Sequence, residues 1–251
     1  MIRRDSSTDN KPMKPRKEKV KKLILSIVFW GLLIGSFLFF SALIILKANG
    51  YQFNVQTWKI NKTGMIVLNA DPQGKIYLDG KALRKPDYPA KIGGLSPGIY
   101  DLEITNPNYQ SWQESIAVNY GEASVYDHIL LFKSNASDTN APADLTLDRL
   151  TAESKNYQNN LNILGSEIYY KGSLITRFSQ NVSTAVVYPD GFHILFQTGQ
   201  QIRIIDIDGS NNKLLFDLPS DQATQLSFRQ GGNLVIYWDT LSSSAKAKIV
   251  H

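Results

Sequence analysis

The sequence predicts a mainly β protein that follows one N-terminal transmembrane helix. Three observations lead to this prediction: a stretch of 24 residues without a charge from Leu23 to Leu46, short alternating runs between residues 64 and 132, and repeated turn-and-strand segments between residues 144 and 251. The alternating runs favour a small antiparallel β-sandwich, and the repeated segments favour two to three β-hairpin sheets. With 251 residues, the chain is long enough for one or two globular domains besides an anchor.

The uncharged stretch is long enough to cross a membrane. As a helix, residues 23–46 reach about 36 Å, whereas the hydrocarbon core of a bilayer measures about 30 Å. A core helix of a soluble protein would show a polar face, and a cleavable signal peptide would have a shorter apolar run that ends at a small-x-small site. The sequence fits neither pattern, so we expect an uncleaved signal anchor with the lipid bilayer as its partner. Gly31, Gly35 and Ser36 form a small-xxx-small pattern through which two such helices could oligomerise.

The positive charge is confined to the start of the chain. Residues 1–22 carry nine Lys and Arg against three Asp and Glu, while the remaining residues carry 18 against 19. The positive-inside rule therefore predicts a basic cytoplasmic tail at 1–22 and extracytoplasmic domains after the span. The tail has no aromatic residue and the body is nearly neutral, which argues against nucleic acid as a partner. The absence of cysteine excludes disulfides and thiolate metal ligands.

Residues 64–132, which follow a juxtamembrane segment at 47–63, show the pattern of half-buried strands. Between Tyr100 and Ile104, apolar side chains alternate with Asp101 and Glu103. Asp79-Gly80 and Pro97-Gly98 are typical turn dipeptides. We expect an antiparallel sandwich without a helix, with a core that includes five alternating positions: Leu78, Tyr100, Leu102, Ile104 and Val118.

Several turns of this segment follow each other in a characteristic order. They are "ADPQGKIYLDGK" (Ala70–Lys81), a proline within Asp87–Leu95, "LSPGIYDLEI" (Leu95–Ile104) and "NYQSW" (Asn108–Trp112). This order resembles the PEGA domain, a small β-sandwich of extracytoplasmic bacterial and archaeal proteins. The four residues that name the family read Pro72-Gln73-Gly74-Lys75 here, so two of them differ. The resemblance implies a cell-surface location and a binding or spacer role, and it carries no catalytic residues to this chain.

Residues 133–143 are almost all small or polar and are predicted to form a flexible linker. Beyond them, "VYPDG" (Val187–Gly191) followed by "FHILF" resembles the turn of WD-repeat and TolB-like β-propeller blades. Aligning Gly191 with Gly232 gives a repeat of 41 residues, a normal blade period. Residues 144–251 have room for two to three blades, whereas a closed propeller needs four or more. We therefore expect either part of a longer product or an open or oligomeric sheet, ending in "SSSAKAKIVH" (Ser242–His251), which suits a buried strand poorly.

The sequence contains no recognisable catalytic, cofactor or metal motif. His128, His193 and His251 have neither the spacing of a metal pair nor a nucleophile elbow beside them. The segment Asp206–Asn211 has oxygen ligands, but it lacks the third acid and the bidentate Glu of an EF-hand loop. We interpret it as a solvent-facing hairpin turn.

These patterns favour a non-enzymatic surface protein that binds through exposed loops. The candidate loops are Lys81–Lys91 and Asn106–Trp112, with Tyr88, Tyr109 and Trp112 as candidate ligand contacts. Aromatic rings beside polar groups suit cell-wall polysaccharide or a segment of an envelope protein. Two alternatives stay open. One is a structural spacer or assembly subunit, in which Tyr109 and Trp112 simply close one end of the sandwich. The other is an envelope enzyme whose active site lies in a further part of a propeller.

Overall fold

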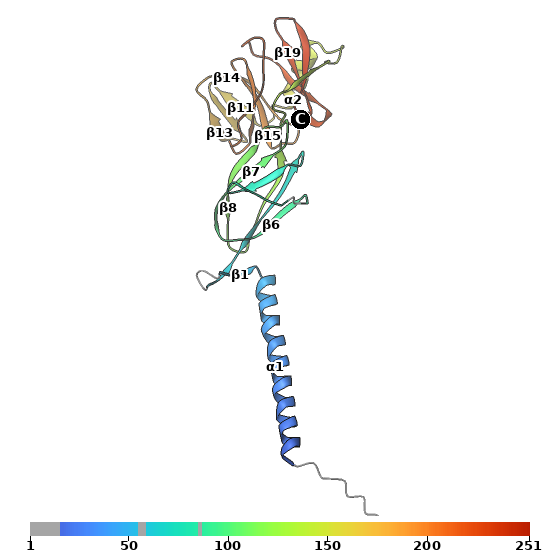
Figure 1. Ribbon diagram of the computed structural model, residues 1–251. Helices are drawn as coiled ribbons and strands as arrows, with labels where there is room; N and C mark the ends of the chain where they lie inside the picture. Colours follow the sequence, from blue (N-terminus) through green and yellow to red (C-terminus); the bar gives the residue numbers. More distant parts are fainter. Residues whose placement is uncertain (1–15, 55–58, 85–86) are drawn as a thin grey trace, which may run out of the picture. The chain divides into compact units, whose positions relative to one another are not determined.

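The computed structural model describes residues 16–54, 59–84 and 87–251, and it divides the chain into two compact units, residues 1–62 and 63–251. Residues 1–15 of the predicted basic tail lie outside the described residues. The described part is mainly β, with one long N-terminal apolar helix and several sheets, none of which closes into a barrel (Figure 1). The predicted fold class is therefore confirmed.

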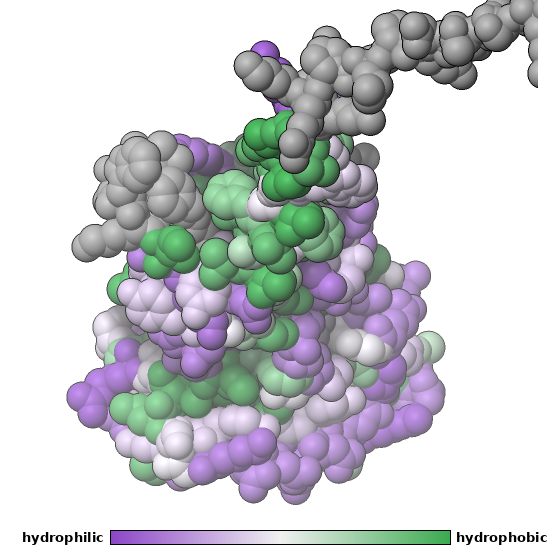
Figure 2. Space-filling view, turned by 90° about the horizontal axis from the view of Figure 1, so that it is seen from below, coloured by the Kyte–Doolittle hydropathy of each residue, from purple (hydrophilic) through white to green (hydrophobic). Residues whose placement is uncertain are grey.

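The first unit contains the helix α1 (Arg16–Ala48), which begins with charged residues and carries no charge from Leu23 to Leu46. Its segment Val20–Ala48 is long and hydrophobic enough to span a membrane, and none of its most apolar stretch is buried. The helix ends before Gly50, whose φ of 76° suits the left-handed residue that commonly follows a helix. A hairpin of β1 (Tyr51–Asn54) and β2 (Lys59–Lys62) follows, with Tyr51 paired to Lys62. Figure 2 shows both hydrophobic and hydrophilic residues on the face that it draws, with hydrophilic residues along the lower and right edges of the view.

The first half of the second unit is a sandwich of two sheets. One sheet has the strand order β6-β3-β9 and the other β5-β4-β7-β8. The sandwich contains no helix, as expected, but β3 and β9 pair in parallel, so the expectation of a purely antiparallel sandwich was wrong. The strands are β3 (Gly64–Asp71), β4 (Lys75–Leu78), β5 (Lys81–Ala82), β6 (Ala90–Leu95), β7 (Gly98–Thr105), β8 (Trp112–Val118) and β9 (Ala123–Leu130).

The core of the sandwich lies between these two sheets. Of the five positions predicted to be buried, Leu102, Ile104 and Val118 are buried, whereas Leu78 and Tyr100 are half-buried against the same core. The phenol of Tyr100 donates a hydrogen bond to the Ser96 carbonyl at 2.7 Å, so its polar end stays near the surface. Alternation therefore predicts which side chains of a strand point toward the core, but it does not predict how deeply each of them is buried.

The second half of the unit contains three sheets in succession. Their strand orders are β11-β12-β13, β14-β15-β16-β17 and β10-β20-β19-β18. The two segments aligned at a spacing of 41 residues both form hairpins, β14–β15 and β18–β19. The strands are β10 (Ser137–Thr139), β11 (Leu161–Leu164), β12 (Glu167–Tyr170), β13 (Ser173–Arg177), β14 (Val182–Val187), β15 (His193–Thr198), β16 (Gln201–Asp206), β17 (Lys213–Asp217), β18 (Leu226–Arg229), β19 (Leu234–Asp239) and β20 (Ser244–Ile249), with a 3-10 turn η1 (Gln230–Gly232).

Three features of this half differ from the sequence prediction. The expected linker at 133–143 contains β10, which pairs with β20, so it does not act as a free spacer. The C-terminal segment does form a strand inside a sheet. Ala247, between Lys246 and Lys248, is buried, and so is Val250 just after the strand. A short helix, α2 (Leu147–Asn156), was not predicted. It begins at the cap Thr146, and Leu150 anchors it in the core.

Candidate functional site

A cavity with a mixed apolar and polar lining lies on the sandwich and includes the predicted contact residue Tyr88. Its volume is about 590 Å³, within the range of small-molecule sites. We call it the Tyr88 groove. Residues 85 and 86 of the predicted loop Lys81–Lys91 lie outside the described part of the chain. The lining residues are Gln73, Gly74, Lys75, Tyr77, Ala82, Leu83, Tyr88, Thr105, Asn106 and Pro107.

Hydrogen bonds hold the walls of the Tyr88 groove together. The Tyr88 hydroxyl donates to the Gly74 carbonyl at 3.0 Å and accepts from the Gly74 amide at 3.2 Å. Partial burial raises the pKa of the Tyr88 phenol, an effect that the Gly74 hydrogen bond offsets in part, so the phenol stays neutral at physiological pH. The Asn106 side chain donates to the Gln73 carbonyl at 2.7 Å and joins the next wall. The groove is thus a preformed surface with a fixed tyrosine ring.

Glycine is required at position 74 for this arrangement. A Cβ atom there would lie 2.5 Å from the Thr105 carbonyl oxygen, closer than such atoms approach in proteins. The strand β4, which begins at Lys75, can therefore approach β7 this closely only because residue 74 has no side chain. Lys75 is the charged residue of the lining, so the groove suits neutral or anionic ligands.

Tyr109 and Trp112 lie away from Tyr88. They belong to the part of the sandwich that contacts the sheets of the second half. Tyr109 packs edge to face on His251, and Trp112 is 5% exposed. The indole Nε1 of Trp112 donates to Asp206 Oδ2 at 3.4 Å. The Gln110 side chain donates to the Leu214 carbonyl at 2.6 Å. The loop Asn106–Trp112 is therefore largely engaged within the protein, and the structure does not bring the three predicted contact residues together.

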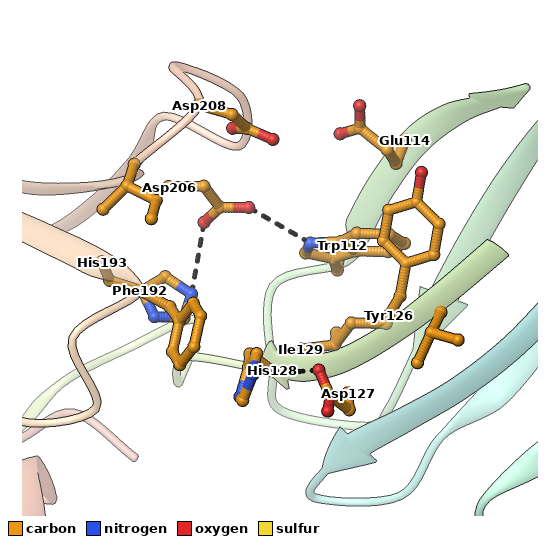
Figure 3. A pocket seen from close by; sticks show the side chains of 12 residues that line it. Trp112, Glu114, Tyr126, Asp127, His128, Ile129, Phe192, His193, Asp206 and Asp208 are labelled. Carbon is orange, nitrogen blue, oxygen red and sulfur yellow. Dashed lines mark hydrogen bonds and ion pairs between the residues drawn. The ribbon is translucent and has the colours of Figure 1, made fainter. Parts of the chain in front are cut away.

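A second, smaller cavity of about 160 Å³ lies at this internal contact. Figure 3 shows Trp112, Glu114 and Tyr126 on one side and His193, Asp206 and Asp208 on the other. His128 and Phe192 stack across the contact with ring centroids 3.3 Å apart. Burial raises the pKa of the Glu114 carboxyl, and the nearby charge of Asp208 raises it further.

The centre of this contact is a buried histidine between two carboxylates. His193 is 2% exposed, and its Nδ1 and Nε2 lie 2.6 Å from Asp190 Oδ2 and 3.2 Å from Asp206 Oδ1. Burial opposes the positive charge, but the two carboxylates outweigh it and raise the pKa of His193 to about 9. Both ring nitrogens are therefore used as donors, so the imidazole has no free lone pair to act as a general base or a metal ligand.

The turn Asp206–Asn211 connects β16 and β17 and satisfies its own side chains. Ser210 donates its backbone N–H and its hydroxyl to Asp208 Oδ1, and the Asn211 amide donates to Asp206 Oδ2 at 3.0 Å. Among the residues that the structure describes, no group of three or more His, Asp or Glu side chains is arranged to hold a metal ion.

Sequence reasoning missed this internal contact, although part of it was visible. Asp190 and His193 are three residues apart, and His193 and Asp206 face each other in the β15–β16 hairpin. Trp112 and Asp206, by contrast, are far apart in the sequence, and no local pattern joins them.

No family model matches this chain, and no curated protein matches it either.

Proposed function

We propose that this chain is a single-pass membrane protein whose body, residues 63–251, is a non-catalytic binding module on the extracytoplasmic side. The observation that carries the proposal is the exposure of α1. Large hydrophobic side chains around its whole circumference are exposed, among them Leu25 at 72%, Leu32 at 70% and Phe37 at 68%. Such a surface is stable in lipid and not in water. The cations that precede the span support a cytoplasmic N-terminus.

We further propose that the sandwich is a PEGA-like domain and that the three following sheets are propeller-like blades. The order of turns in the sequence supports the first assignment. The two hairpins at a spacing of 41 residues support the second. Both assignments fit a surface protein that presents loops and grooves rather than reacting groups.

The Tyr88 groove is the binding site that the structure favours. Tyr77 and Tyr88 supply two aromatic rings, and Lys75, Asn106 and Gln73 supply polar groups beside them. A sugar ring has apolar C–H faces and polar edges, so it complements such a lining. Among the described lining residues, Lys75 is the cation, which makes an anionic or neutral cell-wall polysaccharide the preferred ligand class. A catalytic role has less support, because the buried His193 has both ring nitrogens engaged.

Substitutions of Tyr88 test this function. Tyr88→Ala removes the ring, and Tyr88→Phe removes only the hydroxyl that bonds Gly74. Tyr120→Ala is the matched control, because Tyr120 is 67% exposed outside the groove. We expect Tyr88→Ala to weaken binding to purified cell-wall polymer by about tenfold, equivalent to about 1.4 kcal/mol. The control should bind like the parent. Thermal unfolding is measured on the same samples. If binding falls only in proportion to stability, or if the parent does not bind, the groove is not the binding site.

A further inference from the structure

One end of the sandwich exposes large hydrophobic side chains. Ile99 is 76% exposed, Tyr120 is 67% exposed and Met65 is 38% exposed. Val125, at 58%, lies one step further along β9. In the described part of residues 63–251, nine large hydrophobic side chains are exposed, and three of them, Met65, Ile99 and Tyr120, belong to the same end of one domain. This clustering calls for an explanation.

The strand register shows that these side chains share one end. Gly64 at the start of β3 pairs with Leu95 at the end of β6, and Met65 pairs with Ala123 at the start of β9. In the other sheet, Gly98 at the start of β7 pairs with Val118 at the end of β8. Residues 63–65, 95–99 and 118–123 are therefore adjacent, and we call them the proximal end.

The proximal end is also where the chain arrives from α1. The connection is short, because the β1–β2 hairpin returns the chain to its starting level by pairing Tyr51 with Lys62. The connection consists of three residues from Ala48 to Tyr51, the spacing between two paired strands, and two residues from Lys62 to Gly64. Together these parts span at most about 25 Å.

The charge of the proximal end is low. The charged side chain of the β8–β9 turn is Glu122, and the Asn119 amide donates a hydrogen bond to it at 2.9 Å. An aromatic and an aliphatic side chain next to a single hydrogen-bonded acid are well suited to the boundary between lipid headgroups and acyl chains, where tyrosine is enriched.

We propose that the proximal end docks on the outer surface of the bilayer that holds α1, with Ile99 and Tyr120 inserted at the headgroup level. This contact fixes the height of the body above the membrane. The inference rests on the proposed membrane anchoring, because only the span brings lipid within reach of this end. It names a second lipid contact, distinct from α1 and from the Tyr88 groove.

The absence of cysteine makes single labels possible in the full-length protein. The test uses Ile99→Cys and Tyr120→Cys, each carrying a nitroxide, in vesicles of phosphatidylcholine and phosphatidylglycerol. Collisions with lipid-soluble oxygen and with a water-soluble nickel chelate are compared. Leu241→Cys is the matched control, since Leu241 is 70% exposed in a different turn. Leu33→Cys reports the span itself.

We expect the ratio of oxygen to nickel collisions at positions 99 and 120 to be several-fold higher than at position 241 and lower than that at position 33, which lies near the middle of the span. Equal ratios at 99, 120 and 241, with a high ratio at 33, would overturn the docking and leave the anchor intact. A low ratio at 33 would overturn both the docking and the proposed function. Labels at 99 and 120 that are shielded from both reagents would show a covering protein, such as a second copy, and would also overturn the docking.

Discussion

Replacing His193 provides a demanding test of the internal contact, because its charge depends on two buried carboxylates. Burial disfavours the protonated ring, yet Asp190 and Asp206 raise the pKa of His193 from 6.5 to about 9. A pKa that is raised in the folded state adds stability in full below the unfolded pKa of 6.5, and this stability is lost as the pH rises through 9. The shift corresponds to about 3 kcal/mol. The free energy of unfolding should therefore fall by about this amount between pH 6.5 and pH 9.

The assay is urea unfolding of residues 63–251, followed by the fluorescence of Trp112 and Trp238 across this pH range. His193→Gln should remove the slope and should lower stability at pH 6.5 by about 3 kcal/mol, because it leaves two buried carboxylates without their cation. His128→Gln is the matched control, since its side chain is 47% exposed and its acidic partner Asp127 is 61% exposed. The control should keep the slope. A parent protein with flat stability from pH 6.5 to 9, or a His193 variant that retains the slope, would refute this account of the network.

Two further substitutions test the sandwich and its groove. Leu102→Ala should lower the free energy of unfolding by about 2–5 kcal/mol because Leu102 is 1% exposed. Ile99→Ala on the surface should lower it by under about 0.5 kcal/mol. Both changes are measured by denaturant titration, and equal losses of stability would show that the core is assigned wrongly. Gly74→Ala should lower the melting temperature and weaken polymer binding, because its Cβ would meet the Thr105 carbonyl oxygen, while Gly93→Ala has open space around it and should do neither. A Gly74→Ala protein with parental stability and binding would contradict the close approach at this turn.

Much of the architecture could be predicted because it depends on local patterns. The helix α1 follows from an uninterrupted apolar run, and the sandwich strands follow from alternation around turn dipeptides. The parallel pairing of β3 with β9 could not be predicted in this way. A strand shows the same alternation in either direction, and Met65 and Ala123 meet only in the folded chain.

The prediction of a linker was wrong because a polar edge strand resembles a loop in composition. Ser137–Thr139 has the composition of a loop, but it pairs with β20 at the edge of a sheet, where one side of the strand faces water. An ion pair of Asp138 with Lys248 at 2.8 Å supports it. Composition alone does not separate such a strand from a linker.

The candidate site was predicted only in part. Tyr88 does line a groove, because turn residues around it bring two strands together. Tyr109 and Trp112 were exposed-loop candidates, but they pack against His251 and Asp206. Their partners belong to the second half of the body. Contacts between residues so far apart in the sequence produce no local sequence pattern from which they could be predicted.

The position of the body relative to the membrane is the central claim, and labelling with an impermeant thiol reagent tests it most directly. Leu241→Cys and Ser7→Cys each introduce a single cysteine into the full-length chain, one in the body and one in the N-terminal tail. In intact cells or spheroplasts, the account predicts that Cys at position 241 reacts at once and that Cys at position 7 reacts only after the membrane is permeabilised. Immediate labelling at position 7 with protection at position 241 would contradict the proposed orientation. Labelling of both positions without permeabilisation would contradict the membrane span itself.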